Sequence, residues 1–189
     1  MGVLSVCRVV GVPCALFAST GLMAVPSRCC AADTAVATAE RLPAQFDVLK
    51  RFAGEWQTET LLRRPGPPAR EVATKGKASC RATLGGRYYE FRAETVPPSD
   101  SDLQVMTYDE AARVYRQWVF SSDGYRHEAT GVWDSTTSTM TWRDKSDGGE
   151  FVIEDRWRSA DRLEWNLVRK DAGGNVTQTI TGTVSRIAR

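Results

Sequence analysis

Apolar and polar residues alternate with a period of two along most of this chain, starting just after Gly54. Such alternation between turn signals is typical of half-buried strands. The pattern predicts ten strands, over Glu55–Leu62, Thr74–Thr83, Arg87–Thr95, Leu103–Tyr108, Arg113–Ser121, Tyr125–Trp133, Thr137–Arg143, Glu150–Arg158, Arg162–Arg169 and Val176–Ile187. Most connections are two to five residues long, so consecutive strands are expected to pair antiparallel. Because a meander of this length loses its unpaired edges by closing, we predict an all-β, antiparallel up-and-down β-barrel of about ten strands.

One short N-terminal helix is expected before the first strand. Phe46, Leu49 and Phe52 recur every third residue, which gives one apolar edge at helical spacing. Pro43 precedes this edge and Gly54 follows it, and both residue types favour a helix boundary at such positions.

Alternation also assigns each side chain to one face of its strand. The side chains expected inside the barrel are mostly apolar and include Tyr89, Phe91, His127, Met140, Trp142, Phe151, Ile153, Trp157, Leu163, Trp165, Leu167 and Val184. The fifth strand is the least clear, because apolar residues stand on both of its faces. We place Trp118 and Phe120 inside, which brings Arg116 inside with them.

The first 37 residues have the character of a secretory leader. A single basic residue, Arg8, precedes an apolar run over residues 9–25, and small residues suited to cleavage end at Ala32 or Ala37. We therefore expect residues 1–37 to be a signal peptide with a short linker, and residues 38–189 to be one barrel domain. The protein is expected to be exported, to the periplasm or the extracellular space, without a membrane span in its mature form.

Composition narrows the partners and the chemistry. The chain has 25 Lys and Arg against 23 Asp and Glu, and the two signs are interleaved, so no basic surface for nucleic acid or anionic membranes is expected. Of its five cysteines, only Cys80 follows the leader, which excludes an intrachain disulfide and a cysteine metal site. Cys80 is expected to be a small buried apolar residue. No cofactor is predicted.

An apolar interior with a few polar groups is typical of a small-molecule site. The candidate ligand-binding residues are the aromatic walls and the polar side chains expected among them: Arg116, His127, Tyr89, Trp118, Trp142, Trp165 and Gln178. A buried guanidinium needs an anion to offset its desolvation, so Arg116 would suit a carboxylate or phosphate. The expected ligand is therefore a hydrophobic or amphipathic acid. The alternative is a filled barrel, in which Arg116 pairs with Asp155.

Two other functions stay open at this point, and so does the oligomeric state. The barrel could be a scaffold in the cell envelope, with the proline-rich, basic loop Leu61–Arg70 as its contact surface. An enzyme would use His127 with Tyr89 or Asp155. The sequence has no nucleophile elbow, no His-Glu-x-x-His motif and no phosphate-binding glycine loop, so an enzyme is the less favoured of the two.

The motif Gly54-Glu-Trp56 after a short helix, with Arg186 near the end of the last strand, resembles the Gly-x-Trp and terminal-arginine pairing of the calycins, which include lipocalins and fatty-acid-binding proteins. That resemblance implies that Trp56 closes one end of the barrel and that Arg186 lies over its ring. Further segments are similar to a secreted, mostly bacterial, calycin-like family of unknown function (family 1579): Leu84-Gly-Gly-Arg87, Thr107-Tyr-Asp109, Tyr115-x-x-Trp118 with Ser121-Ser122, and Gly131-x-Trp-Asp134. This similarity implies a fold and an envelope location, and no reaction.

Nitrobindins, which are ten-stranded calycins, hold haem through a histidine near the C-terminus. Residues 160–189 contain no histidine here, and the single histidine of the chain, His127, lies in the sixth predicted strand. Haem binding through His127 is accordingly a lesser alternative.

Overall fold

The computed structural model of the protein describes residues 41–66, 68–96, 100–146 and 149–188. The described residues form helix α1 (Gln45–Lys50) and strands β1 (Gly54–Arg64), β2 (Arg70–Thr83), β3 (Tyr88–Val96), β4 (Asp100–Asp109), β5 (Val114–Ser121), β6 (Arg126–Asp134), β7 (Thr139–Ser146), β8 (Gly149–Ser159), β9 (Arg162–Lys170) and β10 (Val176–Arg186), with a single 3-10 turn at Leu84–Gly86. The expected signal peptide and linker lie outside the described residues.

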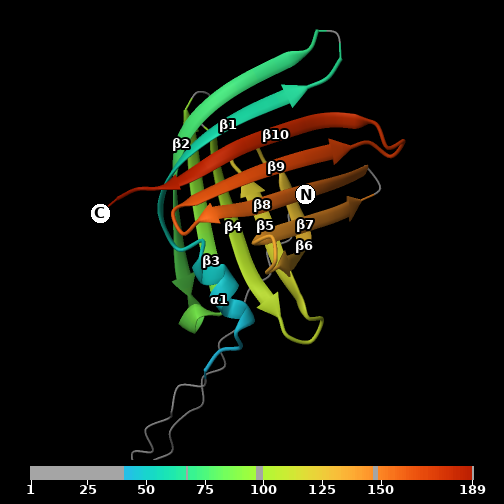
Figure 1. Ribbon diagram of the computed structural model, residues 1–189. Coiled ribbons are helices and arrows are strands. Elements are labelled where there is room, and N and C mark those ends of the chain that lie inside the picture. Colours follow the sequence, from blue (N-terminus) through green and yellow to red (C-terminus); the bar gives the residue numbers. More distant parts are fainter. Residues whose placement is uncertain (1–40, 67, 97–99, 147–148, 189) are drawn as a thin grey trace, which may run out of the picture. The chain divides into compact units, whose positions relative to one another are not determined.

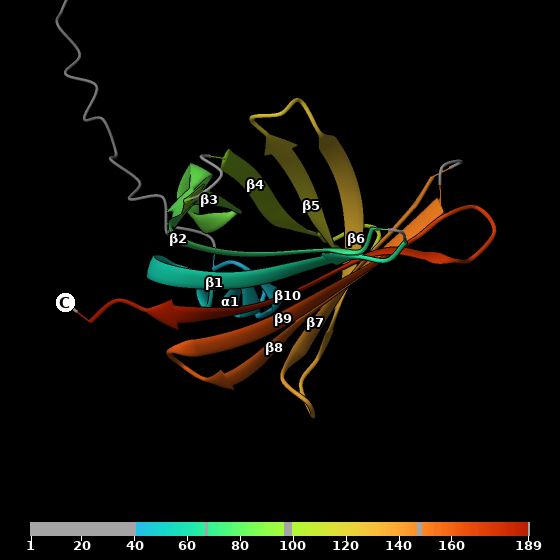
Figure 2. The same ribbon diagram turned by 90° about the horizontal axis from the view of Figure 1, so that it is seen from above.

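The strands form a closed, antiparallel barrel in which each strand pairs with its neighbours in sequence and β1 pairs with β10 (Figure 1). The closing seam runs from the pair Trp56 and Arg186 to the pair Arg63 and Thr179. Seen from above, β3 to β6 spread to one side of β1 and β2, and β7 to β10 spread to the other (Figure 2). The predicted up-and-down barrel of ten strands with one short helix is confirmed.

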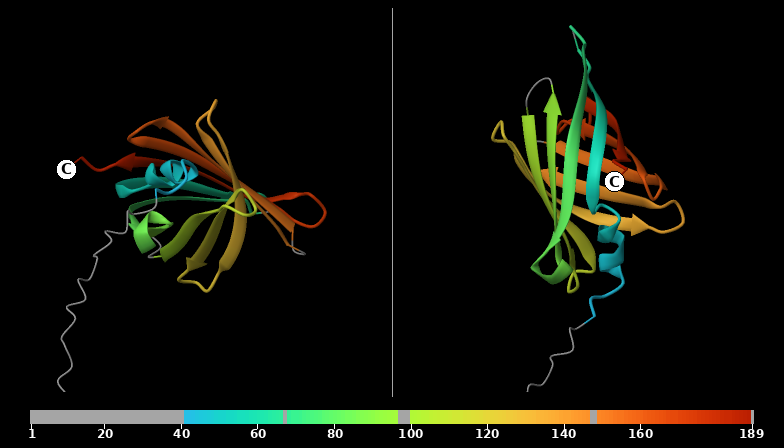
Figure 3. Two further views of the ribbon diagram at one scale, coloured as in Figure 1. Left: turned by 90° about the horizontal axis from the view of Figure 1, so that it is seen from below. Right: turned by 90° about the vertical axis from the view of Figure 1, so that its left-hand side faces the viewer.

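Helix α1 closes one end of the barrel (Figure 3). A six-residue helix is too short to be stable alone, so its packing has to hold it in place. Phe46 and Leu49 are buried on its apolar edge, and Phe52, just beyond the helix, meets the edge of Trp157 at 5.3 Å between ring centroids. The Tyr115 hydroxyl also donates a hydrogen bond to the Gln45 carbonyl at 3.1 Å. The apolar edge predicted from the residue spacing is therefore the edge of α1 that packs into the barrel.

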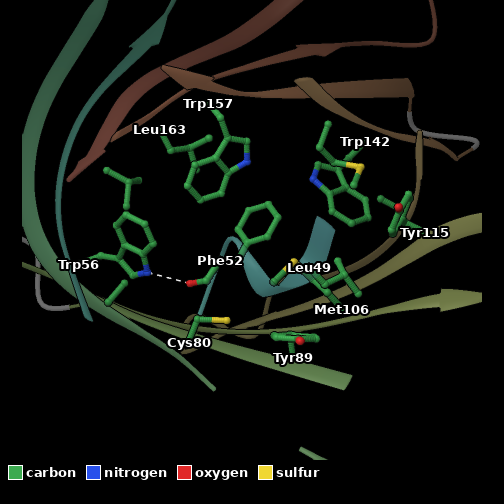
Figure 4. Packing of buried hydrophobic residues seen from close by; sticks show 14 of the residues in the cluster. Leu49, Phe52, Trp56, Cys80, Tyr89, Met106, Tyr115, Trp142, Trp157 and Leu163 are labelled. Atoms are coloured by element: carbon green, nitrogen blue, oxygen red, sulfur yellow. Dashed lines mark hydrogen bonds between the residues drawn. The ribbon is translucent and has the colours of Figure 1, made fainter. Parts of the chain in front are cut away.

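Large side chains fill the half of the barrel next to α1 (Figure 4). The largest fully buried ones are Trp56, Trp142, Tyr89, Phe46, Leu49, Met106 and Met140. A Cβ on Gly131 would stand 2.5 Å from the Trp142 ring, so glycine is what lets this indole lie flat against β6. Cys80 is buried among these residues, as expected, and burial raises the pKa of its thiol to about 12. The thiol is therefore a packing group and not a nucleophile.

The opposite end of the barrel carries the β1–β2, β5–β6 and β9–β10 connections. The long loop expected over Leu61–Arg70 is wrong, because β1 continues to Arg64 and β2 already begins at Arg70. The ladder extends this far because Leu62 pairs with Val72 and because an Arg63–Glu71 ion pair of 2.7 Å forms on the outer face. The turn is thus confined to the residues between the two strands. The β1–β2 hairpin extends beyond β3, because β3 pairs with β2 only as far as Lys75.

Candidate ligand-binding site

A cavity of about 420 Å³ lies inside the barrel, above the filled half. Its apolar walls come from the residue Phe52, just after α1, and from six strands: Leu62, Val72, Phe91, Ala93, Ile153, Leu163, Trp165, Ile180 and Val184. Its polar and charged lining residues are Thr58, Thr60, Thr74, Thr95, Gln104, Gln117, Arg64, Arg70, Asp100, Asp102 and Asp155. An apolar chamber with a few polar groups is the usual construction of a small-molecule site.

Asp155, on β8, is the most deeply buried ionisable group of this cavity. Its Oδ2 accepts a hydrogen bond from Trp142 Nε1 at 2.8 Å. Burial raises the pKa of the carboxyl to about 6, and the Trp142 hydrogen bond opposes that shift only in part. Among the described residues, no lysine or arginine forms an ion pair with it. At neutral pH, Asp155 is therefore mainly a carboxylate whose charge no cation of the described chain neutralises.

A second carboxyl, Asp102 on β4, lines the same cavity from another wall, nearer the open end. The Ser121 hydroxyl donates a hydrogen bond to its Oδ1. Burial raises the pKa of Asp102, the Ser121 hydrogen bond works against this, and the nearby Asp100 and Asp123 raise it further. Like Asp155, this carboxyl has only neutral donors around it within the described chain.

Two glutamines complete the polar lining. Gln117 Nε2, on β5, donates to Gln104 Oε1, on β4, at 2.9 Å. The Gln117 side chain is buried, and its Oε1 has no hydrogen-bond partner in the part of the chain described. Buried polar atoms are nearly always paired, so this oxygen is an acceptor that the barrel itself leaves unused.

A larger hollow, of about 890 Å³, lies on the outer surface of β1, β2, β8, β9 and β10. Six of its lining residues are charged, and four of these pair with one another, Lys75 with Glu59 at 2.8 Å and Arg158 with Glu164 at 2.7 Å. The interior cavity is smaller, but it combines apolar walls with buried polar groups that have no such partners, and it is the better candidate site.

The structure separates the side chains that the sequence grouped into one site. Trp165 lines the cavity, and Trp142 reaches it through the hydrogen bond to Asp155. Tyr89 is buried in the filled half, beside α1, where burial raises the pKa of its hydroxyl. Gln178 pairs in register with Arg169 and is not among the residues that line the cavity.

The placement of Arg116 and Trp118 inside the barrel is wrong. Arg116 lies on the outer face, where it pairs with Asp109 at 3.3 Å and with Glu128 at 3.2 Å, so it does not pair with Asp155. Trp118 lies beside it in an outer groove. Alternation alone could not decide, since both faces of β5 carry apolar residues.

Hairpin register does decide the face of β5. The inner residues of β5 are Tyr115, Gln117 and Val119, which are all buried. They pair directly with Gly131, Ala129 and His127 of β6. Paired residues share a face, so the correct assignment of β6 combined with the short turn at Asp123-Gly124 was the signal that could have placed β5.

His127 points inward near the open end and packs against rings. Its centroid lies 4.4 Å from that of Phe151 and 5.4 Å from that of Tyr125. Burial, helped by the charge of Arg169, lowers the pKa of the imidazole to about 4, so it is neutral at physiological pH. Both ring nitrogens are buried and have no partner among the described residues.

His127 does not suit haem or acid–base catalysis here. It is not among the residues that line the cavity, and its two ring nitrogens, the atoms that would ligate a haem iron, are both buried. No described hydrogen bond or ring contact joins it to Tyr89 or Asp155, the partners considered for an enzyme. Within the described residues, no group of three or more His, Cys, Asp and Glu side chains could hold a metal ion either.

At the closed end, Arg186 lies over Trp56, with its Cζ 4.0 Å from the ring centroid. The Trp56 indole donates a hydrogen bond to the Phe52 carbonyl at 2.8 Å, as drawn in Figure 4. Gly54 is required beside them for two reasons, because its φ is +135° and because a Cβ there would stand 2.2 Å from the Arg186 guanidinium. This pair is structural, and it lies outside the cavity lining.

Comparison with known proteins gives a family and a fold. The model of a family described as "Protein of unknown function (DUF1579)" matches residues 43–186. Among solved structures, Rv2717c from M. tuberculosis is similar with a TM-score of 0.59 and 12% identity, covering 78% of this chain and 100% of that one. The S-type phycobiliprotein lyase CPES from Guillardia theta is similar with a TM-score of 0.53 and 11% identity, covering 79% and 95%. At these identities the likeness establishes the fold alone. No curated protein matches the sequence.

The described part of the chain contains no helix with the length and apolar character needed to cross a membrane.

Proposed function

Because the chain belongs to DUF1579, a family of proteins of unknown function, we propose its function from the barrel itself: it binds one small, mainly apolar molecule in the interior cavity. The observation that carries this proposal is the cavity of about 420 Å³, bounded by ten apolar side chains. Ligand sites typically measure about 300 to 1,000 Å³ and hide most of the ligand from water. Helix α1 closes one end, so the ligand would enter from the end that carries the β1–β2 hairpin.

The proposed site does not include the contact between Arg116 and an acidic ligand that is expected from the sequence. Arg116 is on the outer face and cannot hold an acid in the cavity. The basic residues of the lining, Arg64 and Arg70, are exposed at the open end of the β1–β2 hairpin. A filled scaffold is the weaker reading, because aromatic packing stops short of the cavity.

Occupation of the cavity can be tested with a neutral fluorescent probe. N-phenyl-1-naphthylamine is expected to bind saturably, with one site per chain and a blue-shifted emission. The change Ala93→Phe places a ring in the cavity and should weaken binding by about tenfold or more, which corresponds to ~1.4 kcal/mol. The matched change Val132→Phe, at an exposed position on the outer face, should leave the affinity unchanged.

Circular dichroism should show that both variants are folded. A wild-type chain that fails to bind the probe saturably, or binding that Ala93→Phe does not weaken, would refute the interior site.

We further propose that this binding takes place outside the cytoplasm, on the strength of the leader-like residues 1–37. When the full chain is expressed in a bacterium, the mature protein should begin near Asp33 or Thr38 by intact mass and should appear outside the cytoplasm. Leu16→Arg, which puts a charge in the apolar run, should block this processing, whereas Ser5→Arg, before the run, should not. Unprocessed wild-type protein in the cytoplasm would contradict the proposal.

A further inference from the structure

Three side chains of the cavity lining carry acceptor oxygens that the described residues leave partly or wholly without donors. Trp142 donates its hydrogen bond to Asp155 Oδ2, and Asp155 Oδ1 accepts no hydrogen bond from the described residues. Asp102 has a neutral hydroxyl as its donor, and the Gln117 Oε1 is buried without a partner. These three groups come from different strands and border one chamber. A ligand that complements them has to donate hydrogen bonds.

The charges of the lining also favour a ligand that donates hydrogen bonds. A carboxylate taken out of water loses several kcal/mol of solvation unless a cation or several donors compensate it. The barrel places three carboxyls in the lining, Asp100, Asp102 and Asp155, and keeps its own cations, Arg64 and Arg70, at the exposed rim. Asp155, being the most deeply buried of the three carboxyls, has the most to gain from a cation that enters with a ligand.

The surroundings of Asp155 also suit an organic cation. Trp165, directly paired with Asp155 in the β8–β9 ladder, lines the cavity as well. A protonated amine is stabilised both by a carboxylate and by a neighbouring aromatic face. A carboxylate and an indole side by side, backed by Ile153, Leu163 and Val184, make a pocket for a nitrogen attached to an apolar body.

From this arrangement we infer that the cavity binds small lipophilic amines, with the protonated nitrogen against Asp155, the apolar body along the walls and Asp102 adding negative charge on the side of the open end. This inference rests on the proposed function and adds the ligand class to it. It reverses the sign expected from the sequence, because the acid-binding Arg116 is outside and the buried charges are negative.

Ligands of one chain length that differ in charge can test whether the cavity prefers a cation or an anion. Octylamine, octanol and octanoic acid are used at pH 7.4 to displace N-phenyl-1-naphthylamine from the wild-type protein. Octylamine is expected to bind about tenfold more tightly than octanol, in line with a charge-assisted hydrogen bond of ~1.5 kcal/mol or more, and octanoate is expected to bind most weakly.

Variants then locate the charge. Asp155→Asn should remove the preference for octylamine over octanol, so that the ratio of the two affinities falls from about ten to about one. Glu90→Gln, which removes the same charge from the outer face, should keep the preference. If the probe binds but octanoate equals or exceeds octylamine, or if Asp155→Asn keeps the amine preference, the amine inference fails and the cavity site stands. If the probe does not bind saturably, the proposed function itself fails.

Discussion

Lowering the pH from 7 to 4 is expected to stabilise the wild-type protein, relative to the Asp155→Asn variant, by about 2 to 3 kcal/mol. Burial raises the pKa of Asp155 from 3.8 to about 6, so the folded chain holds this proton more tightly than the unfolded chain does. A carboxyl of this kind destabilises the fold fully above pH 6, progressively less between pH 6 and 4, and not at all once both states are protonated. The shift from 3.8 to 6 corresponds to a limit of ~3 kcal/mol.

The comparison isolates this single carboxyl. Urea unfolding followed by tryptophan fluorescence at pH 7, 6, 5 and 4 gives the free energy of unfolding of both proteins. Asparagine keeps an acceptor for Trp142 Nε1, and any constant cost of its buried amide cancels when the pH slopes are compared. The other ionisable groups that line the cavity, Asp100, Asp102, Arg64 and Arg70, are common to both chains. Parallel slopes for the two proteins would show that Asp155 is solvated in the folded protein, and would contradict a buried charge at this residue.

A positive result would set stability against function at one residue. The carboxylate that weakens the fold at neutral pH is the one proposed to bind an amine. Binding of a cation should lower the Asp155 pKa again, so the ligand should stabilise the wild type more strongly at pH 7 than at pH 5. Strained or poorly compensated groups of this kind are commonly retained for function.

Much of the fold could be predicted because alternation and turn chemistry agree along the chain. The pattern places strands β6 and β8 correctly, since their inner and outer faces differ sharply: Ala129 and Gly131 are buried, whereas Thr130 between them is exposed. The helical edge of Phe46 and Leu49 is equally clear, because the period of apolar residues changes from three to two where β1 begins.

The site was less predictable than the fold, for two physical reasons. On β5, apolar residues on both faces leave the orientation to the hairpin register, and this sent Arg116 to the wrong side. On β4, the strand begins at Asp100, earlier than the apolar residues indicate, so Asp102 falls outside the predicted strand Leu103–Tyr108 although it is a cavity residue. The local sequence pattern indicates which residues are favourable to bury. It does not indicate a carboxyl that is buried despite the free-energy cost of desolvation.

Arg186→Ala is expected to lower the free energy of unfolding by about 3 to 4 kcal/mol, the largest loss we predict for a partly exposed side chain of this barrel. Its guanidinium lies 4.0 Å from the Trp56 centroid, which is worth about 0.5 to 2 kcal/mol. It also donates hydrogen bonds to three backbone carbonyls and to Asp161, at distances from 2.6 to 3.3 Å, and charge-assisted bonds of this type are worth about 1.5 to 3 kcal/mol when the acceptors are otherwise unpaired.

The reason for so large an effect is that one side chain ties three segments together at the closed end. Arg186, on β10, reaches the carbonyl of Ala53 between α1 and β1, and that of Ala160 in the β8–β9 turn. Arg186→Lys keeps the charge but cannot serve several carbonyls with a planar fork, so it should lose about half as much stability. Arg63→Ala, which breaks an exposed ion pair, should cost less than about 1 kcal/mol in the same urea unfolding experiment. Equal losses for Arg186→Ala and Arg63→Ala would mean that the closed end is held by aromatic packing alone, and that the guanidinium is only a cover on Trp56.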